Sequence, residues 1–431
     1  MTEQILEEIK QKIVEYHKKK FANTHSDYTP ASAKYFDERE LIYATEAVLD
    51  GWWTEGRFSI KFASELAKFL DVKYAILTNS GSSANLLAMS ALTSHLLGDD
   101  KLKPGDEVIT VSGGFPTTVN PIIQHGLVPV LIDIEIGTYN TTPEMVEAAI
   151  TDKTRAVMIA HTLGNPYKVR EIKELCERYN LFLIEDCCDA FGSTYEGKKV
   201  GSFGDLATLS MYPAHHITTG EGGAVFTNNS KLKKAVQSIR DWGKDCWCPP
   251  GKDNSCCKRF DWTLGDLPEG YDHKYIFSHL GYNLKTTDLQ SALGLAQLEK
   301  VDFFTNKRKA NFVELWKGLE DLQEKLILPL ATQGSEPSWF GFPITVKGDE
   351  KKELIAHLEN KGIGTRPLFC GDITKQPFFK NYDFNYRVVG DLENTNQMML
   401  KTFWIGLHPK IGPVERKKII DAFKGFYISL P

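Results

Sequence analysis

The sequence lacks the features that mark membrane-spanning, nucleic-acid-binding and secreted proteins. Its 431 residues contain no apolar run long enough to span a bilayer. The formal net charge is −5 and there is no basic tract, which argues against a nucleic-acid-binding protein. The N-terminal stretch MTEQILEEIKQKIVEYHKKKF predicts a charged amphipathic helix without the apolar centre of a signal peptide. We therefore expect a cytoplasmic protein that binds neither nucleic acid nor membranes.

Short β-rich runs alternate with helical patterns between about residues 72 and 225. The runs are YAILTNS, DEVITVS, VPVLIDI, RAVMIAHT and LFLIEDCC. This alternation predicts an α/β fold with a mostly parallel sheet and helices on both faces. Ligands of such sheets bind at the carboxyl ends of the strands. We expect an N-terminal helical segment over residues 1–34, a large domain over 35–300 and a smaller C-terminal α+β domain over 301–431.

Residues 241–282 break this pattern. They contain four cysteines, three tryptophans, several glycines and few aliphatic residues. A loop this long inside a compact domain is usually functional or disordered, and its aromatic content argues against disorder. We therefore expect an ordered, cysteine-rich insertion in the large domain.

A candidate phosphate site opens the segment SGSSANLLAMSAL, which follows a predicted strand and begins a helix. Gly81 permits a tight turn there. The backbone N–H groups and hydroxyls of Ser82 and Ser83 are suited to holding a phosphate at the helix N-terminus. A plain helix cap explains this segment equally well when it is taken alone.

Three more residues are candidates for binding an aromatic, phosphorylated ligand. Asp186, in LIEDCCDA, follows a β-rich run, where a carboxylate can pair with a protonated pyridine nitrogen. Phe115, in VSGGFPTTVN, can stack on a ring, and Ser210 can add a hydroxyl to a phosphate. In isolation, a loop-capping role is the commoner interpretation of Asp186, and a place in the core explains Phe115 equally well.

The segment MYPAHHITTGEGGAVFT, Met211 to Thr227, contains no lysine. It contains His215 and His216 before the glycine-rich run that ends at Gly223. A lysine amine can hold an aldehyde cofactor as a Schiff base, and an imidazole cannot. An imidazole can, however, move a proton near neutral pH.

Four segments together carry a family resemblance. TNSGSSANLLA, IEDCCDAFG, SMYPAHHITTGEGGAVFT and GYNLKTTDLQSALGLAQLE resemble, in order and spacing, the DegT/DnrJ/EryC1/StrS family of pyridoxal-phosphate (PLP)-dependent sugar aminotransferases. The resemblance runs from about residue 35 to the end. It implies the fold-type I PLP-dependent aminotransferase fold, with residues 35–300 as the cofactor-binding domain.

The resemblance also implies roles for individual residues. By this resemblance, Asp186 would pair with the pyridine nitrogen and Phe115 would stack on the ring. The residues near the phosphate would be Gly81, Ser82, Ser83 and Ser210. Asn283 reaches the phosphate from a second subunit, which implies a homodimer. Lys285 departs from the family, because many relatives have arginine there.

The family's cofactor lysine aligns with His215 when Tyr212 and the glycine-rich run are matched, and His216 then fills a variable position. Family members that remove the C3 hydroxyl of 4-keto-6-deoxy sugar nucleotides also carry histidine there. The resemblance therefore implies pyridoxamine 5′-phosphate (PMP) held without a covalent link. It implies that His215 removes a proton from the cofactor C4′ carbon while Asp186 stabilises the positive ring. The sequence leaves open whether His215 or Tyr212 protonates the departing hydroxyl.

Four cysteines follow a spacing that suits metal binding. After Cys188 come 57 residues, Cys246, one residue, Cys248, seven residues and Cys256. Four thiolates can hold a [2Fe–2S] cluster, and they can also hold zinc, although structural zinc sites favour wider spacing between paired ligands. The spacing does not choose between Cys188 and Cys187, or between Cys256 and Cys257.

The same spacing, combined with His215, resembles the iron–sulfur branch of the family. These enzymes are PMP- and [2Fe–2S]-dependent 3-dehydrases that act on CDP-4-keto-6-deoxyglucose in 3,6-dideoxyhexose biosynthesis, a route to lipopolysaccharide O-antigen. The resemblance selects Cys188, Cys246, Cys248 and Cys256 as ligands. It also implies an electron donor, an NADH-dependent reductase that contains FAD and a [2Fe–2S] cluster and docks on the insertion.

Two other interpretations remain open. One is a PMP-dependent 3-dehydratase of the same fold that needs no cluster and regenerates its amine cofactor from glutamate; it leaves the cysteine-rich insertion unused. The other is a non-enzymatic sugar-nucleotide sensor with structural zinc, which leaves the set of cofactor residues without a purpose.

Overall fold

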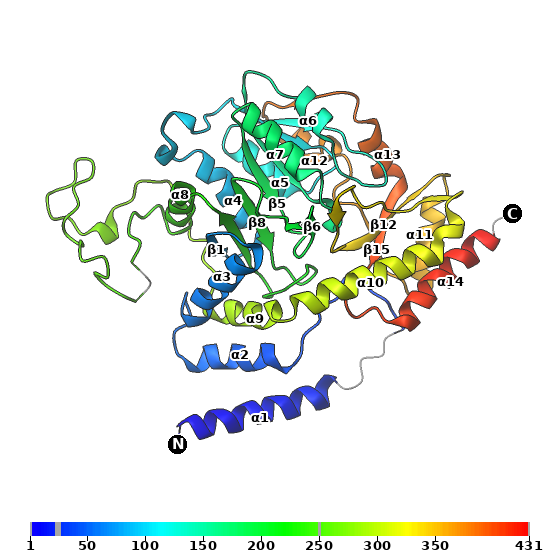
Figure 1. Ribbon diagram of the computed structural model, residues 1–431, viewed down its shortest axis with the longest axis horizontal. Coiled ribbons are helices and arrows are strands. Elements are labelled where there is room, and N and C mark those ends of the chain that lie inside the picture. The colour runs from blue at the N-terminus through cyan, green and yellow to red at the C-terminus, as the bar shows by residue number, and fades with distance from the viewer. Residues whose placement is uncertain (1, 22–26, 249–250, 430–431) are drawn as a thin grey trace.

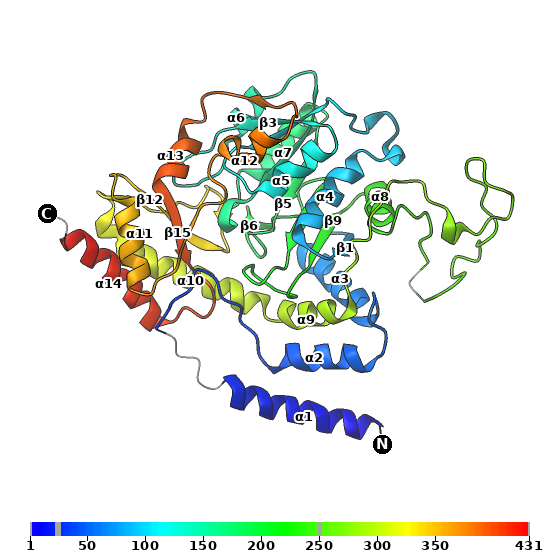
Figure 2. The same ribbon diagram turned by 180° about the vertical axis from the view of Figure 1, so that it is seen from behind.

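The computed structural model describes residues 2–21, 27–248 and 251–429 (Figure 1). The predicted N-terminal helix is confirmed as α1 (Thr2–Phe21). It lies along α2 (Glu38–Leu49), to which the Lys10–Glu46 ion pair of 3.1 Å ties it (Figures 1 and 2). Among the described residues, no helix is both long and apolar enough to cross a membrane.

An eight-stranded sheet forms the centre of the molecule, in the order β1-β9-β8-β5-β4-β2-β3-β14. Strand β9 is antiparallel to both of its neighbours, and the other neighbouring pairs are parallel. The prediction of a mostly parallel sheet is therefore confirmed. The strands are β1 (Tyr74–Thr78), β2 (Glu107–Val111), β3 (Val128–Ile132), β4 (Thr154–Ala160), β5 (Phe182–Asp186), β8 (Leu206–Ser210), β9 (Gly223–Thr227) and β14 (Arg387–Val388).

Helices cover both faces of this sheet because its strands are apolar on both sides. Neighbouring residues such as Leu183 and Ile184 of β5 belong to two different apolar clusters. One cluster includes side chains of α4 (Gly81–Leu92) and α8 (Ser230–Arg240). The other includes side chains of α3 (Arg57–Leu70), α7 (Val169–Arg178) and α9 (Asp288–Leu298).

A second, antiparallel sheet lies in the C-terminal region, in the order β10-β12-β15-β13. Helices α10, α11 and α14 pack against it around a separate apolar cluster. Strand β14 leaves this region and pairs with β3 of the large sheet, although it lies within the range predicted for the C-terminal domain. The elements are α10 (Val301–Leu319), β10 (Leu326–Ile327), β12 (Gly341–Val346), α11 (Lys351–Asn360), β13 (Thr365–Pro367), α13 (Glu393–Lys401), β15 (Thr402–Gly406) and α14 (Pro413–Ser429).

Shorter elements complete the chain. A three-stranded sheet has the order β11-β6-β7. The remaining helices and strands are α5 (Pro116–Gln124), α6 (Pro143–Ala148), β6 (Thr194–Tyr195), β7 (Lys198–Lys199), β11 (Ser335–Glu336) and α12 (Pro377–Asn381).

The cysteine-rich insertion projects from the body beside α8 in both views (Figures 1 and 2). The one helix among its described residues is the short 3-10 turn η3 (His273–Tyr275). Its two ends, Asp241–Gly243 and Gly281–Asn283, meet at a narrow neck. A Cβ atom on Gly281 would lie 2.0 Å from the backbone nitrogen of Gly243, so this approach requires glycine.

Candidate active site

Asp186, at the carboxyl end of β5, has a fixed carboxylate. It is 4% exposed, and its Oδ2 accepts hydrogen bonds from Asn85 Nδ2 and Thr118 Oγ1, both at 2.8 Å. Its Oδ1 accepts from the backbone N–H of Cys188 at 3.1 Å. The contact with Cys188 is the loop cap that Asp186 taken alone predicts. The other two contacts fix the carboxylate against helices α4 and α5. A carboxylate fixed in this way is suited to pairing with a protonated ring nitrogen.

The N-terminus of α4 meets the end of β8. Ser80 caps the helix, since its Oγ accepts from the backbone N–H of Ser83 at 3.0 Å. A Cβ atom on Gly81 would lie 2.3 Å from Cβ and 2.7 Å from Oγ of Ser210. The close approach of Ser210 therefore requires glycine at position 81. The tight turn expected from the sequence is not the reason, because the backbone of Gly81 is not left-handed. The structure brings the hydroxyl of Ser210 to the helix N-terminus that Gly81, Ser82 and Ser83 form.

The glycine-rich run contributes to the same junction. A Cβ atom on Gly223 would lie 2.4 Å from the carbonyl oxygen of Ser80. Glycine at this position lets β9 lie against the turn that leads into α4. The backbone N–H groups of Gly81 and Ser82, which open the helix, are suited to holding an anion at this junction.

His215 lies beside a carboxylate that sequence reasoning missed. Its Nδ1 is 3.2 Å from Asp189 Oδ1, with the ring N–H out of line for a straight hydrogen bond, and the two side chains are 16% and 12% exposed. Its ring centre is 5.3 Å from that of Phe340. A carboxylate at Nδ1 favours the tautomer that leaves Nε2 free to take a proton. Asp189 follows Asp186 by three residues in IEDCCDA, and this second aspartate was the available signal.

His216 has a different hydrogen-bond partner. It is buried, and its Nε2 donates to the carbonyl oxygen of Ser338 at 2.6 Å. Burial, aided by the nearby Arg308, holds the pKa of His216 well below its usual value. His216 is therefore a neutral, structural histidine, and His215 is the one of the two that lies beside Asp189.

Tyr212 and Phe115 are both available to a ligand. Tyr212 is 51% exposed, and its ring centre is 6.4 Å from that of His215. Phe115 precedes α5, is 49% exposed and has an edge contact with Phe369 at 6.4 Å. Neither aromatic ring is a core residue, which removes the alternative interpretation of Phe115.

Asn283 lies exposed at the neck of the insertion, where it bridges to Asp241. The next residue, Leu284, accepts a hydrogen bond from the backbone N–H of Asn79 at 2.9 Å. The neck therefore lies close to the start of α4. The predicted reach of Asn283 to a partner subunit stays a prediction.

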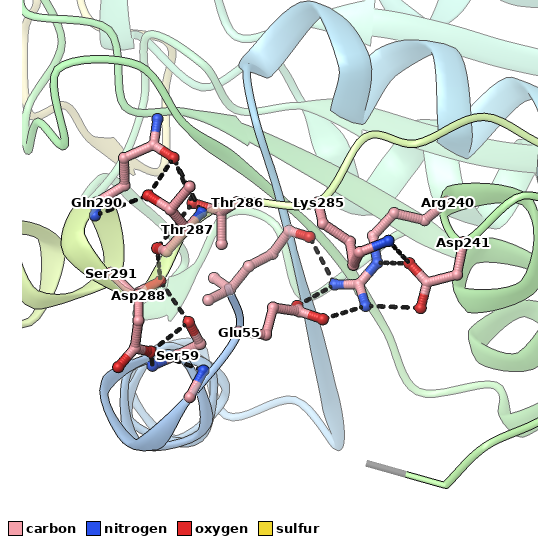
Figure 3. A network of polar contacts seen from close by, with 12 residues as sticks. Glu55, Ser59, Arg240, Asp241, Lys285, Thr286, Thr287, Asp288, Gln290 and Ser291 are labelled. Carbon is pink, nitrogen blue, oxygen red and sulfur yellow. Dashed lines mark hydrogen bonds and ion pairs between the residues drawn. The ribbon is translucent and has the colours of Figure 1, made fainter. Parts of the chain in front are cut away.

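A buried arginine anchors this neck, and sequence reasoning missed it. Arg240 donates to Glu55 at 2.5 and 2.8 Å and to Asp241 Oδ1 at 2.9 Å (Figure 3). Lys285 joins this network with its Nζ 3.7 Å from Asp241 Oδ1 and 3.4 Å from the ring centre of Trp242. Burial lowers the pKa of Lys285. Lys285, at the position where many relatives have arginine, thus contacts Asp241 and Trp242 at the neck of the insertion.

The structure brings three of the four predicted metal ligands together. The ligand atoms of Cys246, Cys248 and His273 all lie within 4.8 Å of one another. Cys256 Sγ is 3.2 Å from His273 Nε2, whereas Cys257 is exposed. Partial burial raises the pKa of the Cys248 thiol, but hydrogen bonds with Ser255 and Cys256 outweigh it and lower the pKa to about 7.

Cys188 lies elsewhere, in the loop after β5. Burial and the charge of Asp186 raise the pKa of its thiol well above the usual value. Among the described residues, Cys188 belongs to no close group of three or more potential metal ligands. Its neighbour Cys187 is buried in the core. Among the described residues, the four predicted cysteines therefore do not form one close group, and His273 lies beside Cys246, Cys248 and Cys256.

Comparisons with known proteins agree with this arrangement. The DegT/DnrJ/EryC1/StrS aminotransferase family matches residues 34–424. The chain is 56% identical to the lipopolysaccharide biosynthesis protein RfbH of Salmonella typhimurium, over 92% of this chain and 91% of that protein. It is 50% identical to a dTDP-4-dehydro-2,6-dideoxy-D-glucose 3-dehydratase of Saccharopolyspora spinosa, over 96% and 90% of the two chains.

A solved structure supports the fold. The GDP-4-keto-6-deoxy-D-mannose-3-dehydratase of E. coli, with bound hydrated PLP, superimposes with a TM-score of 0.83 at 28% identity. The match covers 92% of this chain and 100% of the other. The predicted PLP-dependent aminotransferase fold is thereby confirmed.

Proposed function

Since the chain belongs to the DegT/DnrJ/EryC1/StrS aminotransferase family, we propose that it is a PMP-dependent 3-dehydratase of a 4-keto-6-deoxy sugar nucleotide. The observation that carries this proposal is His215, which stands beside Asp189 at the position of the family's lysine. Without that lysine, the cofactor cannot be held as a Schiff base between turnovers. The relatives that are named as 3-dehydratases support the same reaction.

The residues around Asp186 fit PMP. The N-terminus of α4 and Ser210 would hold its phosphate, because Gly81 leaves no side chain in the way. The fixed carboxylate of Asp186 would keep the pyridine nitrogen protonated, and the exposed ring of Phe115 would stack on the cofactor. When bound, PMP supplies an amine for the sugar ketone and a ring that accepts electrons.

His215 performs the proton transfers in this proposal. With PMP bound, its Nε2 would take a proton from the cofactor C4′ carbon, while Asp189 at Nδ1 would keep the imidazole oriented and stabilise its positive charge. The departing C3 hydroxyl needs a proton as it leaves. His215 can return the proton it took, and the exposed Tyr212 is the other group within reach of the same region.

The sequence supports a finer proposal about electrons and substrate. We propose that the insertion binds a [2Fe–2S] cluster, that the substrate is CDP-4-keto-6-deoxyglucose in 3,6-dideoxyhexose biosynthesis, and that an FAD- and [2Fe–2S]-containing, NADH-dependent reductase docks on the insertion. The three thiols gathered in the insertion support a metal centre, and the name of the Salmonella relative supports a role in lipopolysaccharide biosynthesis. A homodimer in the cytoplasm, with Asn283 serving the partner's cofactor, completes this proposal.

The alternative is a PMP-dependent 3-dehydratase that needs no cluster. The position of Cys188, away from the thiols of the insertion, favours it. It predicts dehydration supported by glutamate in the absence of any reductase. Turnover that requires both NADH and the reductase would contradict it.

The substitution His215→Lys tests the proton-transfer role. We expect this variant to form a Schiff base with PLP that borohydride traps covalently, and to lose at least about 99% of its dehydration activity because no imidazole remains to move the proton. The matched control is His95→Lys, which places a lysine at an exposed histidine outside the site. A His215→Lys enzyme that dehydrates at the normal rate would refute the role of His215.

A further inference from the structure

We infer that Arg308 is a positioning residue that holds the imidazole of His215 in one orientation. It acts through Phe340, whose backbone it binds, and through its charge beside Asp189. The inference rests on the proposed function only for the reaction that this orientation serves. The arrangement itself follows from the contacts that Arg308 makes in the interior of the protein.

Arg308 is a buried cation whose hydrogen bonds go to the backbone. It lies in α10 and is 1% exposed. Burying a guanidinium costs free energy unless its hydrogen bonds and its charge are matched. Among the described residues, its acceptors are the carbonyl oxygens of Trp339 and Phe340, at 3.1 and 2.9 Å from Nη1. The guanidinium therefore fixes the backbone at these two residues.

The segment that Arg308 binds is also held from two other directions. His216 Nε2 donates to the carbonyl oxygen of Ser338 at 2.6 Å. The backbone N–H of Phe340 donates to the carbonyl oxygen of Leu163 at 2.8 Å. Because these hydrogen bonds restrain the backbone on both sides of the segment, the ring of Phe340 has little freedom to move.

The ring of Phe340 packs against His215. Their ring centres are 5.3 Å apart, and Phe340 is 7% exposed. The ring centre of Trp404 lies 5.3 Å from that of Phe340, so Phe340 is itself supported by a large side chain. Asp189 lies 3.2 Å from Nδ1 of His215. An imidazole that contacts both a fixed ring and a carboxylate has fewer orientations than one that contacts either alone.

Arg308 also acts on Asp189 through its charge. Burial lowers the pKa of Arg308 to about 10, and the negative charge of Asp189 opposes this decrease. Arg308 therefore stays positive at neutral pH, and the attraction between the opposite charges acts on both partners. The cation thus balances the carboxylate of Asp189 while the imidazole of His215 is neutral.

The guanidinium and the imidazole border the same small cavity. A space of about 10 Å³ is lined by His215, His216 and Arg308, among other residues. One water molecule needs about this much room, so no larger group lies between these side chains. A substitution at position 308 therefore acts on His215 at short range.

The tautomer of His215 gives the most direct test, because it can be measured without substrate. The full-length protein is labelled with ¹⁵N-histidine, and NMR at about pH 8.5 records neutral imidazoles. The signal of His215 is identified by its loss in His215→Gln. We expect one tautomer, protonated at Nδ1 and unprotonated at Nε2. A mixture of tautomers in the unmodified protein would overturn the inference, whether or not any variant folds.

Substitutions at position 308 separate charge from volume. Arg308→Met keeps much of the volume but neither the charge nor the hydrogen bonds, and we expect a mixture of His215 tautomers. Arg308→Lys keeps the charge and can donate to a carbonyl oxygen of the same segment, so we expect one tautomer. An unchanged single tautomer in Arg308→Met would overturn the inference.

The matched control is Arg387→Met. It removes hydrogen bonds of 2.9 and 2.7 Å to Glu107, at the β14 edge of the large sheet. We expect this variant to be less stable and to keep the single tautomer of His215. The control therefore distinguishes the loss of a specific contact from a general loss of stability.

Turnover tests what the orientation of His215 serves. We expect Arg308→Met to lower kcat about 100-fold, with the KM for the sugar nucleotide changed by less than about twofold. We expect Arg308→Lys to recover a kcat within about tenfold of the unmodified enzyme. A raised KM with a normal kcat would overturn the positioning role. No dehydration by the unmodified protein would refute the proposed function, while the NMR comparison would still decide whether Arg308 holds His215.

Discussion

The cofactor residues around Asp186 and the thiols around His273 are held in place by different means. Asp186, Ser210 and the start of α4 lie at the ends of strands and helices that pack on both faces of a large sheet. These thiols and His273 lie in a loop with one short helix among its described residues, fixed by a narrow neck, two tryptophan rings and an ion pair. Backbone packing therefore determines the geometry of the first group, whereas the order of the second would depend more on the proposed metal.

This difference matters for how each site is expected to fail. Substitutions near Asp186 should change chemistry or cofactor affinity while the fold stays intact. Removal of the metal should loosen the insertion, because metal-binding free energy contributes to the order of a loop that has little core of its own.

The largest expected effect distinguishes the two groups of residues by what a substitution removes, which is turnover alone or turnover together with iron. We expect Asp186→Asn to lower turnover about a thousandfold, because an amide cannot hold the pyridine nitrogen in its protonated form, while iron content stays unchanged. Cys248→Ser is the opposite case, and we expect it to lose iron and turnover while PMP binding persists. Turnover and metal content measured on both variants check this pair. Loss of iron from Asp186→Asn would show that the two sites are not independent.

The next largest effect concerns metal removal. We expect chelation to raise the rate of proteolytic cleavage within residues 241–282 at least about tenfold, with little change in the rate for the body. Timed proteolysis followed by mass spectrometry locates the cuts. Equal protection with and without metal would show that the neck and the aromatic rings order the insertion unaided.

A smaller effect is expected at the phosphate site. Gly81→Ala places a Cβ atom 2.3 Å from Ser210 Cβ, so we expect a shift of the helix N-terminus that costs about 1–3 kcal/mol and weakens PMP binding roughly 10- to 100-fold. Gly425→Ala is the matched control, because a Cβ atom there meets nothing within 4 Å. Titration of PMP into both variants measures the change. Unchanged affinity in Gly81→Ala would place the phosphate elsewhere.

The smallest expected effect is a pH dependence of the free energy of unfolding, which arises in the main body of the protein. Burial holds the pKa of His216 well below its usual value of about 6.5, so below that pH the unfolded chain binds a proton that the native chain does not. This part of the stability is complete above about pH 6.5 and falls by about 1.4 kcal/mol per pH unit as the pH decreases toward the native pKa.

We expect His216→Gln to remove this part of the slope. Glutamine can still donate to the carbonyl of Ser338 but does not titrate, and His408, whose pKa burial lowers to about 4, keeps its own part. Urea unfolding at about pH 7 and about pH 5.5 measures the change. The same slope in the variant and the unmodified protein would mean that His216 is charged in the native state.

The large sheet, and the place of Asp186 and Ser210 at its strand ends, could be predicted from the sequence, because strand patterns are local signals. Asp186 and Ser210 lie at the ends of β5 and β8. The boundary between the large and the C-terminal domain was harder to predict. The two-residue strand β14 carries no pattern of its own, and only pairing with β3 places it in the large sheet.

Residues whose role depends on distant partners could not be predicted. Asp189 and Arg240 are ordinary charged residues in sequence, and only the fold brings them to His215 and Glu55. His273 carries no signal in the cysteine spacing, and the turn that brings its ring to Cys256 is fixed by Arg259 and Asp272. Cys188 shows the converse, because the resemblance placed it in a set of four that does not form one close group among the described residues.

The most direct test of this account is the product formed from CDP-4-keto-6-deoxyglucose when the enzyme is supplied with PMP, NADH and the reductase. We predict a 4-keto-3,6-dideoxy sugar nucleotide, identified by mass spectrometry and NMR from the loss of oxygen at C3. A 4-amino sugar nucleotide that keeps its C3 hydroxyl would contradict the account, because it would show that His215 has not replaced transamination with dehydration.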